Sequence, residues 1–231
     1  MRYCGISVGR EFQHLCALEE VRAAEPPIRL GATFFEPGRV DQVVQQVRAL
    51  GDVVVGIAGP LTPGESRACD AELRRRGVLP QPRHEASARL AEALGDLGLF
   101  GPGEEGREGA VDEGAFHDAA LFETNADGIF CALQGRRVPA KRHPFGIQLR
   151  VQELEDDHVL DEDEHALWAR RIEEIEAAAA ALCAHRFAVG HARWIGDPAE
   201  GVVVLPGTHL PDRFSPEGVL PALRRVPLPG G

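Results

Sequence analysis

The first twenty residues show the alternation of apolar and polar positions that is typical of β-strands. A run of small and β-branched residues fills positions 2–8, a polar break follows at residues 9–11, and alternation resumes through Phe12, His14, Cys16 and Leu18. Two apolar strands joined by a short polar break form a hairpin. The sequence therefore predicts an antiparallel hairpin at the start of the chain.

Ser7 is the one polar side chain in the middle of the first predicted strand. Alternate side chains of a strand share a face, so Ser7 lies on the face of Gly5 and Tyr3. Two interpretations stay open at this point. The hydroxyl group either satisfies a neighbouring backbone carbonyl, or the strand presents it to a functional site.

The remaining pattern predicts alternating strands and helices. Residues 53–60 form a continuous apolar run, which is typical of a central strand that is covered on both faces. This strand is expected to run parallel to the first, because a helix connects it to the hairpin. The other predicted strands are residues 28–35, 119–122 and 201–206, and the predicted helices are residues 40–50, 65–76, 84–99, 125–133, a segment from residue 146 onward, and 163–189.

This order of elements defines a fold class. Three antiparallel strands, a helix, and then parallel strands with helices on both faces of a mixed sheet predict an α/β protein with a ribonuclease H-like core. One such domain is expected over residues 1–231, because no linker divides the chain. Residues 101–114 are rich in Gly and Glu and predict a surface loop insertion, and the Pro-rich tail from residue 211 is expected to be loosely packed.

Composition excludes several classes of protein. The chain has no run of about 18 apolar residues and no apolar leader. We therefore expect a cytoplasmic location and no membrane partner. Its five cysteines form no CxxC pair, which suits buried thiols in a reducing compartment and argues against structural zinc.

Charge points to a local binding segment. A net charge of −11 disfavours general binding to polyanions, yet residues 128–152 contain no acid. Lys141, Arg142 and Arg150 lie in this segment, and Lys141 is the only lysine among 25 basic residues. A lysine is a compact point charge for phosphate, so we expect Lys141, Arg142 and Arg150 to bind phosphate or nucleic acid. The alternative is a solvated basic face.

Two acids are placed for metal chemistry. Glu123 ends a predicted strand, and Glu176 lies in the last long helix next to its apolar stripe. Two-metal phosphodiester hydrolysis needs several carboxylates at one end of a sheet to bridge the ions. Glu123 and Glu176 are therefore the predicted catalytic residues and metal ligands. His14 and His143 are further candidates, with a purely structural role as their alternative.

Six motifs, in order, make the chain resemble a bacterial family, the domain of unknown function 429. They are GISVG (residues 5–9), GIAGP (56–60), RACDAELRRRG (67–77), FET (122–124), PAKRHPFGIQLR (139–150) and RRIEEIEAAAAAL (170–182). The resemblance covers nearly the whole chain. It implies a ribonuclease H-like fold, Mg²⁺ or Mn²⁺ as cofactor, and the activity of a predicted nuclease.

The chain departs from this family at two ligand positions. The first and second motifs of the family carry aspartates where this chain has Ser7 and Ala58. Neither side chain replaces a carboxylate as a Mg²⁺ ligand, so Glu123 and Glu176 are expected to hold at most one metal. The sequence thus predicts weak or lost hydrolysis with retained phosphate or nucleic-acid binding. An active nuclease that uses a substitute acid such as Glu173, and a non-catalytic interaction or regulatory protein, are the alternatives.

Overall fold

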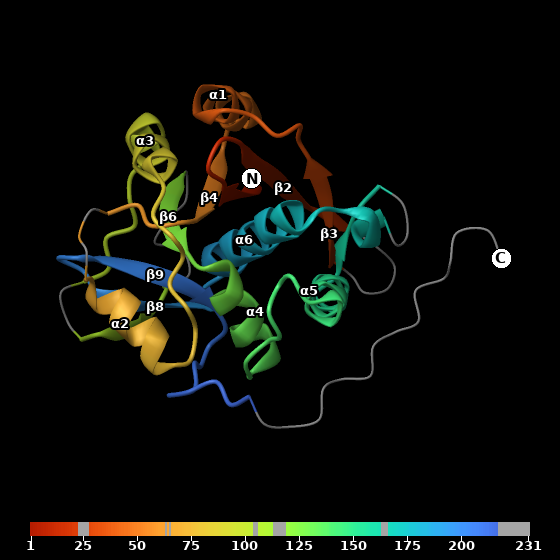
Figure 1. Ribbon diagram of the computed structural model, residues 1–231. Helices are drawn as coiled ribbons and strands as arrows, with labels where there is room; N and C mark the ends of the chain where they lie inside the picture. Colours follow the sequence, from red (N-terminus) through yellow and green to blue (C-terminus); the bar gives the residue numbers. More distant parts are fainter. Residues whose placement is uncertain are drawn as a thin grey trace.

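The computed structural model describes residues 1–22, 28–62, 64, 66–103, 106–112, 119–162 and 166–216. Its strands form one mixed nine-stranded sheet in the order β5-β8-β9-β6-β4-β1-β2-β3-β7 (Figure 1). The strands are β1 (Arg2–Val8), β2 (Gln13–Arg22), β3 (Ile28–Phe34), β4 (Val53–Ala58), β5 (Glu108–Ala110), β6 (Ala120–Thr124), β7 (Val159–Leu160), β8 (Ala192–Asp197) and β9 (Gly201–Pro206).

Strand directions confirm the predicted fold class. β1 and β2 pair antiparallel, as do β2 and β3, whereas β4 is parallel to β1, and β6 is parallel to β4. Three antiparallel strands followed by parallel ones give the ribonuclease H-like arrangement. The sheet extends this core, because β8 and β9 form an antiparallel pair that carries the short strand β5 at one edge.

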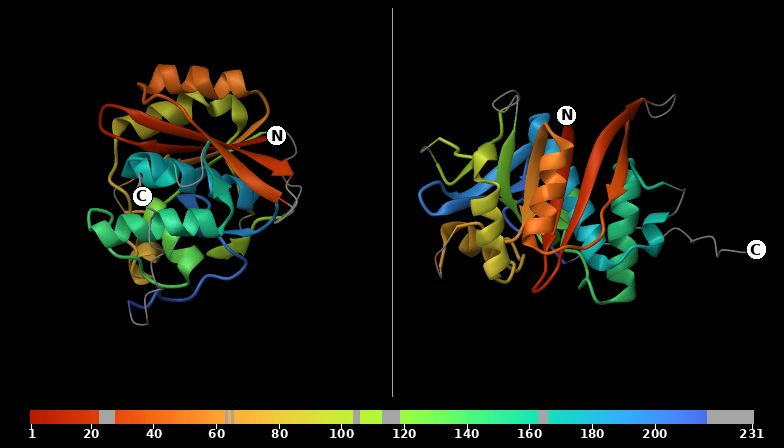
Figure 2. Two further views of the ribbon diagram at one scale, coloured as in Figure 1. Left: turned by 90° about the vertical axis from the view of Figure 1, so that its right-hand side faces the viewer. Right: turned by 90° about the horizontal axis from the view of Figure 1, so that it is seen from above.

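Helices cover both faces of the sheet (Figures 1 and 2). They are α1 (Val40–Leu50), α2 (Ala68–Arg75), α3 (Glu85–Ala93), α4 (Ala126–Gln134), α5 (Pro144–Asp156) and α6 (Ile172–Ala188), with short 3₁₀ turns η1 (Gly95–Leu97) and η2 (Ala166–Ala169). α1 and α3 pack on one face against alternate residues of β1, β2 and β4, such as Ile6, Leu15 and Ile57. α6 packs on the other face and contacts β1, β2 and β4.

Small residues allow α6 to lie directly on the sheet. A Cβ atom at Gly5 would fall 2.0 Å from the carbonyl oxygen of Ala177, and one at Gly56 would fall 2.8 Å from that of Ala180. The run from Ala177 to Ala181 is completely buried. Glycines on the strands and alanines on the helix therefore bring the start of α6 close to the end of β1.

Several predicted elements differ from the structure. The predicted helix over residues 163–189 is interrupted, because the backbone forms η2 and then starts α6 at Ile172, where Glu174 accepts a hydrogen bond from the N–H of Arg171. Residues 163–165 lie outside the described part. The predicted helix over residues 84–99 ends at Ala93 and continues as η1. Sequence reasoning also missed the strands β5, β7 and β8.

The start of the Pro-rich tail is packed rather than loose. Phe214 is buried, and its N–H donates to the carbonyl of Arg76 at 2.9 Å. Residues 217–231 lie outside the described part. No helix in the described part of the chain has the length and apolar character needed to cross a membrane.

Candidate functional site

The ends of β1, β4 and β6 form the centre of the candidate site. Ser7 pairs with Ala58 across β1 and β4, and Ala58 pairs with Thr124 across β4 and β6. The predicted adjacency of Ser7 and Ala58 is thereby confirmed. Both side chains face α6, since Ser7 bonds to Glu176 and Ala58 packs against Ala180.

Glu176 is held from two sides by groups of the chain itself. The hydroxyl of Ser7 donates to Oε2 of Glu176 at 3.2 Å, and the ammonium of Lys141 donates to Oε1 at 2.6 Å. The Glu176 side chain is 6 % exposed, whereas that of Lys141 is 44 % exposed. A neutral hydroxyl and a cation thus occupy both oxygens of the carboxylate.

The loop that carries Lys141 is fixed by Arg150. The Arg150 side chain is 1 % exposed and forms an ion pair with Asp127 at 2.6 Å. It also donates to the carbonyl oxygens of Pro139 and Gly146. Arg150 was predicted to bind phosphate, but its buried, bonded guanidinium does not fit that role; it shapes the loop instead.

The other residues of this loop are open to solvent. Arg142 is exposed and forms no ion pair with any described residue. His143 is also exposed, and its Nδ1 accepts a hydrogen bond from the N–H of Phe145, which caps the start of α5. Lys141 and Arg142 are therefore the two predicted phosphate-binding cations that a ligand can reach.

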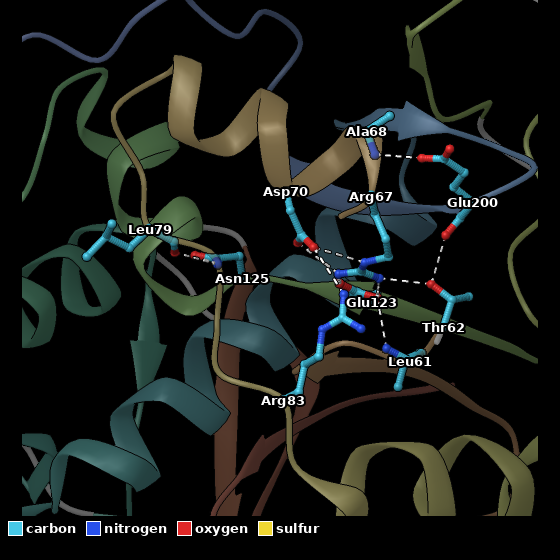
Figure 3. Close-up of polar contacts among 10 residues, drawn as sticks. All are labelled: Leu61, Thr62, Arg67, Ala68, Asp70, Leu79, Arg83, Glu123, Asn125 and Glu200. Atoms are coloured by element: carbon cyan, nitrogen blue, oxygen red, sulfur yellow. Dashed lines mark hydrogen bonds and ion pairs between the residues drawn. The ribbon is translucent and has the colours of Figure 1, made fainter. Parts of the chain in front are cut away.

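Glu123 occupies a separate ionic cluster (Figure 3). Arg67 donates to both carboxylate oxygens of Glu123 at 2.7 Å. The backbone N–H of Leu61 donates to the same carboxylate at 2.8 Å. Burial raises the pKa of Glu123, and the hydrogen bonds and charge of Arg67 oppose that shift. Burial alone would lower the pKa of Arg67, but its hydrogen bonds to Glu123 and Asp70 raise it.

Glu123 and Glu176 lie on opposite faces of the sheet. On β6, Phe122 stacks on Phe187 of α6, and Thr124 lies 3.6 Å from Cys183 of α6. Alternation along the strand turns Glu123 to the other face. Among the described residues no hydrogen bond or ion pair joins the two carboxylates, and Ala58, Ala126 and Ala180 pack together on the α6 face.

These surroundings do not fit a divalent metal. One potential ligand atom from each of Cys69, Asp70 and Glu123 lies within 4.8 Å of the others. Arg67 donates to both oxygens of Asp70 as well as to both of Glu123, so a metal would have to displace a buried guanidinium. Burial raises the pKa of the Cys69 thiol to about 12, which disfavours the thiolate that binds metals. Glu176 offers a metal one carboxylate that Lys141 already neutralises.

His14 adds a polar group beside Ser7. The two residues pair across β1 and β2, and the Nδ1 atom of His14 is buried without a hydrogen-bond partner in the described structure. Burial lowers the pKa of His14, while the nearby carboxylates of Glu173 and Glu174 oppose the shift. The predicted candidate His14 therefore lies at the site, next to the start of α6.

Arg67 and Asp70 were not predicted to take part. Their spacing of three residues indicates a local ion pair on a helix start, which the structure contains at 2.9 Å. The pairing of Arg67 with Glu123 joins residues 56 positions apart. Only the folding of β6 beside β4 brings Glu123 to Arg67, so no local sequence pattern predicts this contact.

Comparisons with known proteins identify no family for the chain. No family model matches it, and no curated protein matches it. A solved structure, described as the Thermus thermophilus RuvC structure, is similar with 14 % identity and a TM-score of 0.37. The similarity covers 81 % of this chain and 94 % of that one. A TM-score this low supports no conclusion about activity or ligand.

Proposed function

We propose that this chain is a ribonuclease H-like protein of the domain of unknown function 429 type that binds a phosphate-containing ligand, such as a nucleic acid, and no longer hydrolyses it. The observation that carries the proposal is the contact of 2.6 Å between Lys141 Nζ and Glu176 Oε1. It puts a half-exposed cation at the acidic end of the sheet. A cytoplasmic location belongs to the same proposal and suits the five cysteines, which are all free and buried.

The loss of hydrolysis follows from the carboxylates. Two-metal catalysis requires acids that hold both ions between them and bridge to the phosphate. Here Ser7 and Ala58 supply no carboxylate. Glu123 is held in an ion pair with Arg67, and Glu176 is held in an ion pair with Lys141. The remaining acids face opposite sides of the sheet, so they have no common metal to share.

Phosphate binding rests on the Lys141 loop. An ammonium group has three donors, and the contact with Glu176 uses one of them. Arg142 follows directly, exposed and unpaired with the acids of the described chain. A phosphate group can therefore bind to Lys141 and Arg142 together while Lys141 keeps its contact with Glu176. Arg150 holds the loop in place through its hydrogen bond to the carbonyl of Pro139.

The experiment measures both binding and cleavage. Fluorescence anisotropy with labelled single- and double-stranded DNA and RNA, over a salt series, compares wild type with Lys141→Ala, Arg142→Ala and the matched control Arg74→Ala on the exposed face of α2. We expect both loop variants to weaken binding several-fold and to lower its salt dependence by about one counterion each. The Arg74 variant should change neither quantity.

The same samples are incubated with Mg²⁺ and with Mn²⁺. Absence of turnover together with loop-dependent binding supports the proposal. Turnover that Glu123→Gln or Glu173→Gln abolishes would establish the alternative, an active nuclease with substitute acids. Wild-type affinity that is unchanged in both loop variants would instead favour an interaction or regulatory protein that does not bind phosphate through this loop.

A further inference from the structure

We infer that Lys141 is a built-in cation that takes the place of a divalent metal at Glu176, so that a carboxylate introduced at Ser7 binds a metal only when Lys141 is removed. This inference concerns the cation at Glu176 and does not depend on whether the loop binds phosphate.

The environment of Glu176 requires a positive charge. The residue is 5 % exposed, and a buried carboxylate without a counter-charge is strongly unfavourable. Lys141 supplies that charge at 2.6 Å, and in the described structure no other cation bonds to Glu176. An ammonium is a compact point charge, as a metal ion is, whereas a guanidinium is a wide planar fork. Lys141 is also the only lysine of the chain.

The backbone holds Lys141 at this position. A Cβ atom at Gly146 would lie 2.2 Å from the carbonyl oxygen of Ala140, so the first turn of α5 packs directly on the residue that precedes Lys141. Arg150 binds the carbonyl of Pro139 at 2.9 Å on the same loop. The backbone that carries Lys141 is therefore anchored, and it holds the ammonium beside Glu176.

Ser7 marks the position where a second carboxylate would meet the same cation. Its hydroxyl lies 3.2 Å from Oε2 of Glu176, so an aspartate side chain here would place its oxygens next to that carboxylate. With Lys141 present, the ammonium offsets one of the two negative charges and occupies the position beside Glu176 that a metal would need. Without Lys141, two adjacent buried carboxylates would need a divalent cation, which prefers such oxygen ligands.

The test is a set of four proteins: wild type, Ser7→Asp, Lys141→Met, and the double variant. Methionine keeps the length of the lysine stem and removes its charge. Mn²⁺ binding is measured by calorimetry, and thermal melting is recorded with EDTA and with Mn²⁺. The control is Ser7→Asn combined with Lys141→Met, which has a similar shape and lacks the second carboxylate.

We expect wild type and Ser7→Asp to show no saturable Mn²⁺ binding and no metal-dependent melting. The double variant should bind Mn²⁺ at least tenfold more tightly than either single variant, and it should melt higher in Mn²⁺ than in EDTA, because a ligand of the folded state stabilises it. The asparagine control should lose this binding.

Two results would overturn the inference. The first is Ser7→Asp binding Mn²⁺ as tightly as the double variant, since Lys141 would then not exclude the metal. The second is a folded double variant without Mn²⁺ binding. If the double variant does not fold in EDTA, refolding in Mn²⁺ decides: Mn²⁺ must restore the folded double variant and leave the asparagine control unchanged, and equal responses of the two proteins would contradict the inference.

This test and the binding experiment fail separately. Loss of nucleic-acid binding in every assay would refute the proposed function and would leave the metal exclusion by Lys141 intact. Conversely, metal binding to Ser7→Asp alone would refute the exclusion and would leave the phosphate contacts of Lys141 and Arg142 untouched.

Discussion

Arg67 binds Glu123 through both ends of its guanidinium, with two contacts of 2.7 Å across the space between the β4–α2 connection and the end of β6. All of its N–H donors are used, because the remaining ones reach Asp70 and Thr62. A saturated, buried guanidinium has no donor left for a ligand. Arg67 therefore has a structural role, and its ion pair leaves Glu123 unavailable as a metal ligand or catalytic group.

Replacing Arg67 should unfold this end of the sheet. Arg67→Met leaves Glu123 and Asp70 buried without their main counter-charge, and we expect a loss of about 3–5 kcal/mol in the free energy of unfolding. Urea denaturation measures it. The exposed Arg74→Met is the matched control and should stay within about 0.5 kcal/mol of wild type. A loss below about 1 kcal/mol for Arg67→Met would contradict the claim that Glu123 and Asp70 are buried and depend on Arg67 for their counter-charge.

The close contact of β1 and α6 gives a second prediction. Gly5→Ala puts a Cβ atom 2.0 Å from the carbonyl of Ala177 and 2.1 Å from the N–H nitrogen of Ala181. The backbone has to separate there, so we expect a loss of about 3 kcal/mol or more in the free energy of unfolding and a weaker Ser7–Glu176 contact. Gly101→Ala, which has no atom within 4 Å of its Cβ position, is the control. Equal melting of the two variants would contradict the observed helix approach.

His14 predicts how stability depends on pH. Its folded-state pKa is lowered, chiefly by burial, so the unfolded chain binds the proton more readily as pH falls below the ordinary imidazole value of about 6.5. Wild type should therefore lose stability relative to His14→Gln as pH is lowered through this range, and the two should keep a constant difference above it. The measurement is urea unfolding of both proteins from pH 5 to 8. A difference that does not change with pH would mean that the imidazole is not desolvated.

Lys141 can be tested by its chemistry, because it is the only lysine. Pyridoxal phosphate joins an aldehyde to a phosphate, so a phosphate site at this loop should direct it to the Lys141 amine, where borohydride reduction fixes the adduct. Peptide mass spectrometry should find more labelling at Lys141 than with pyridoxal, and Arg142→Ala should reduce that excess several-fold. Equal labelling by both aldehydes would argue that no phosphate group is recognised there.

Much of the fold was predictable because its signals are local. Alternation through Phe12, His14 and Cys16 indicated the hairpin, and the apolar run of β4 indicated a central parallel strand. The topology then placed Ser7 beside Ala58, as the structure confirms. The strand β8 was not predicted, because Arg193 interrupts its apolar pattern. In the structure Arg193 donates a hydrogen bond to Glu108 of β5.

The site was predictable only in part, because its decisive contacts join distant segments. Glu176, Lys141 and Ser7 were each selected from the sequence, and the structure brings them together. The contact between Lys141 and Glu176 depends on a loop that Arg150 anchors. The pattern of charges along the sequence does not reveal that Arg150 is buried. The separation of Glu123 from Glu176 follows from strand alternation, which turns adjacent residues of β6 to opposite faces.

The exclusion of metal from Glu123 and Glu176 is tested most directly by soaking crystals of the protein in Mn²⁺ and recording anomalous scattering at the manganese edge. We predict that the ammonium of Lys141 stays within hydrogen-bond distance of Glu176, that Arg67 stays on Glu123, and that no anomalous peak appears within bonding distance of either carboxylate. A manganese ion bound to Glu176, with Lys141 displaced into solvent, would contradict this prediction.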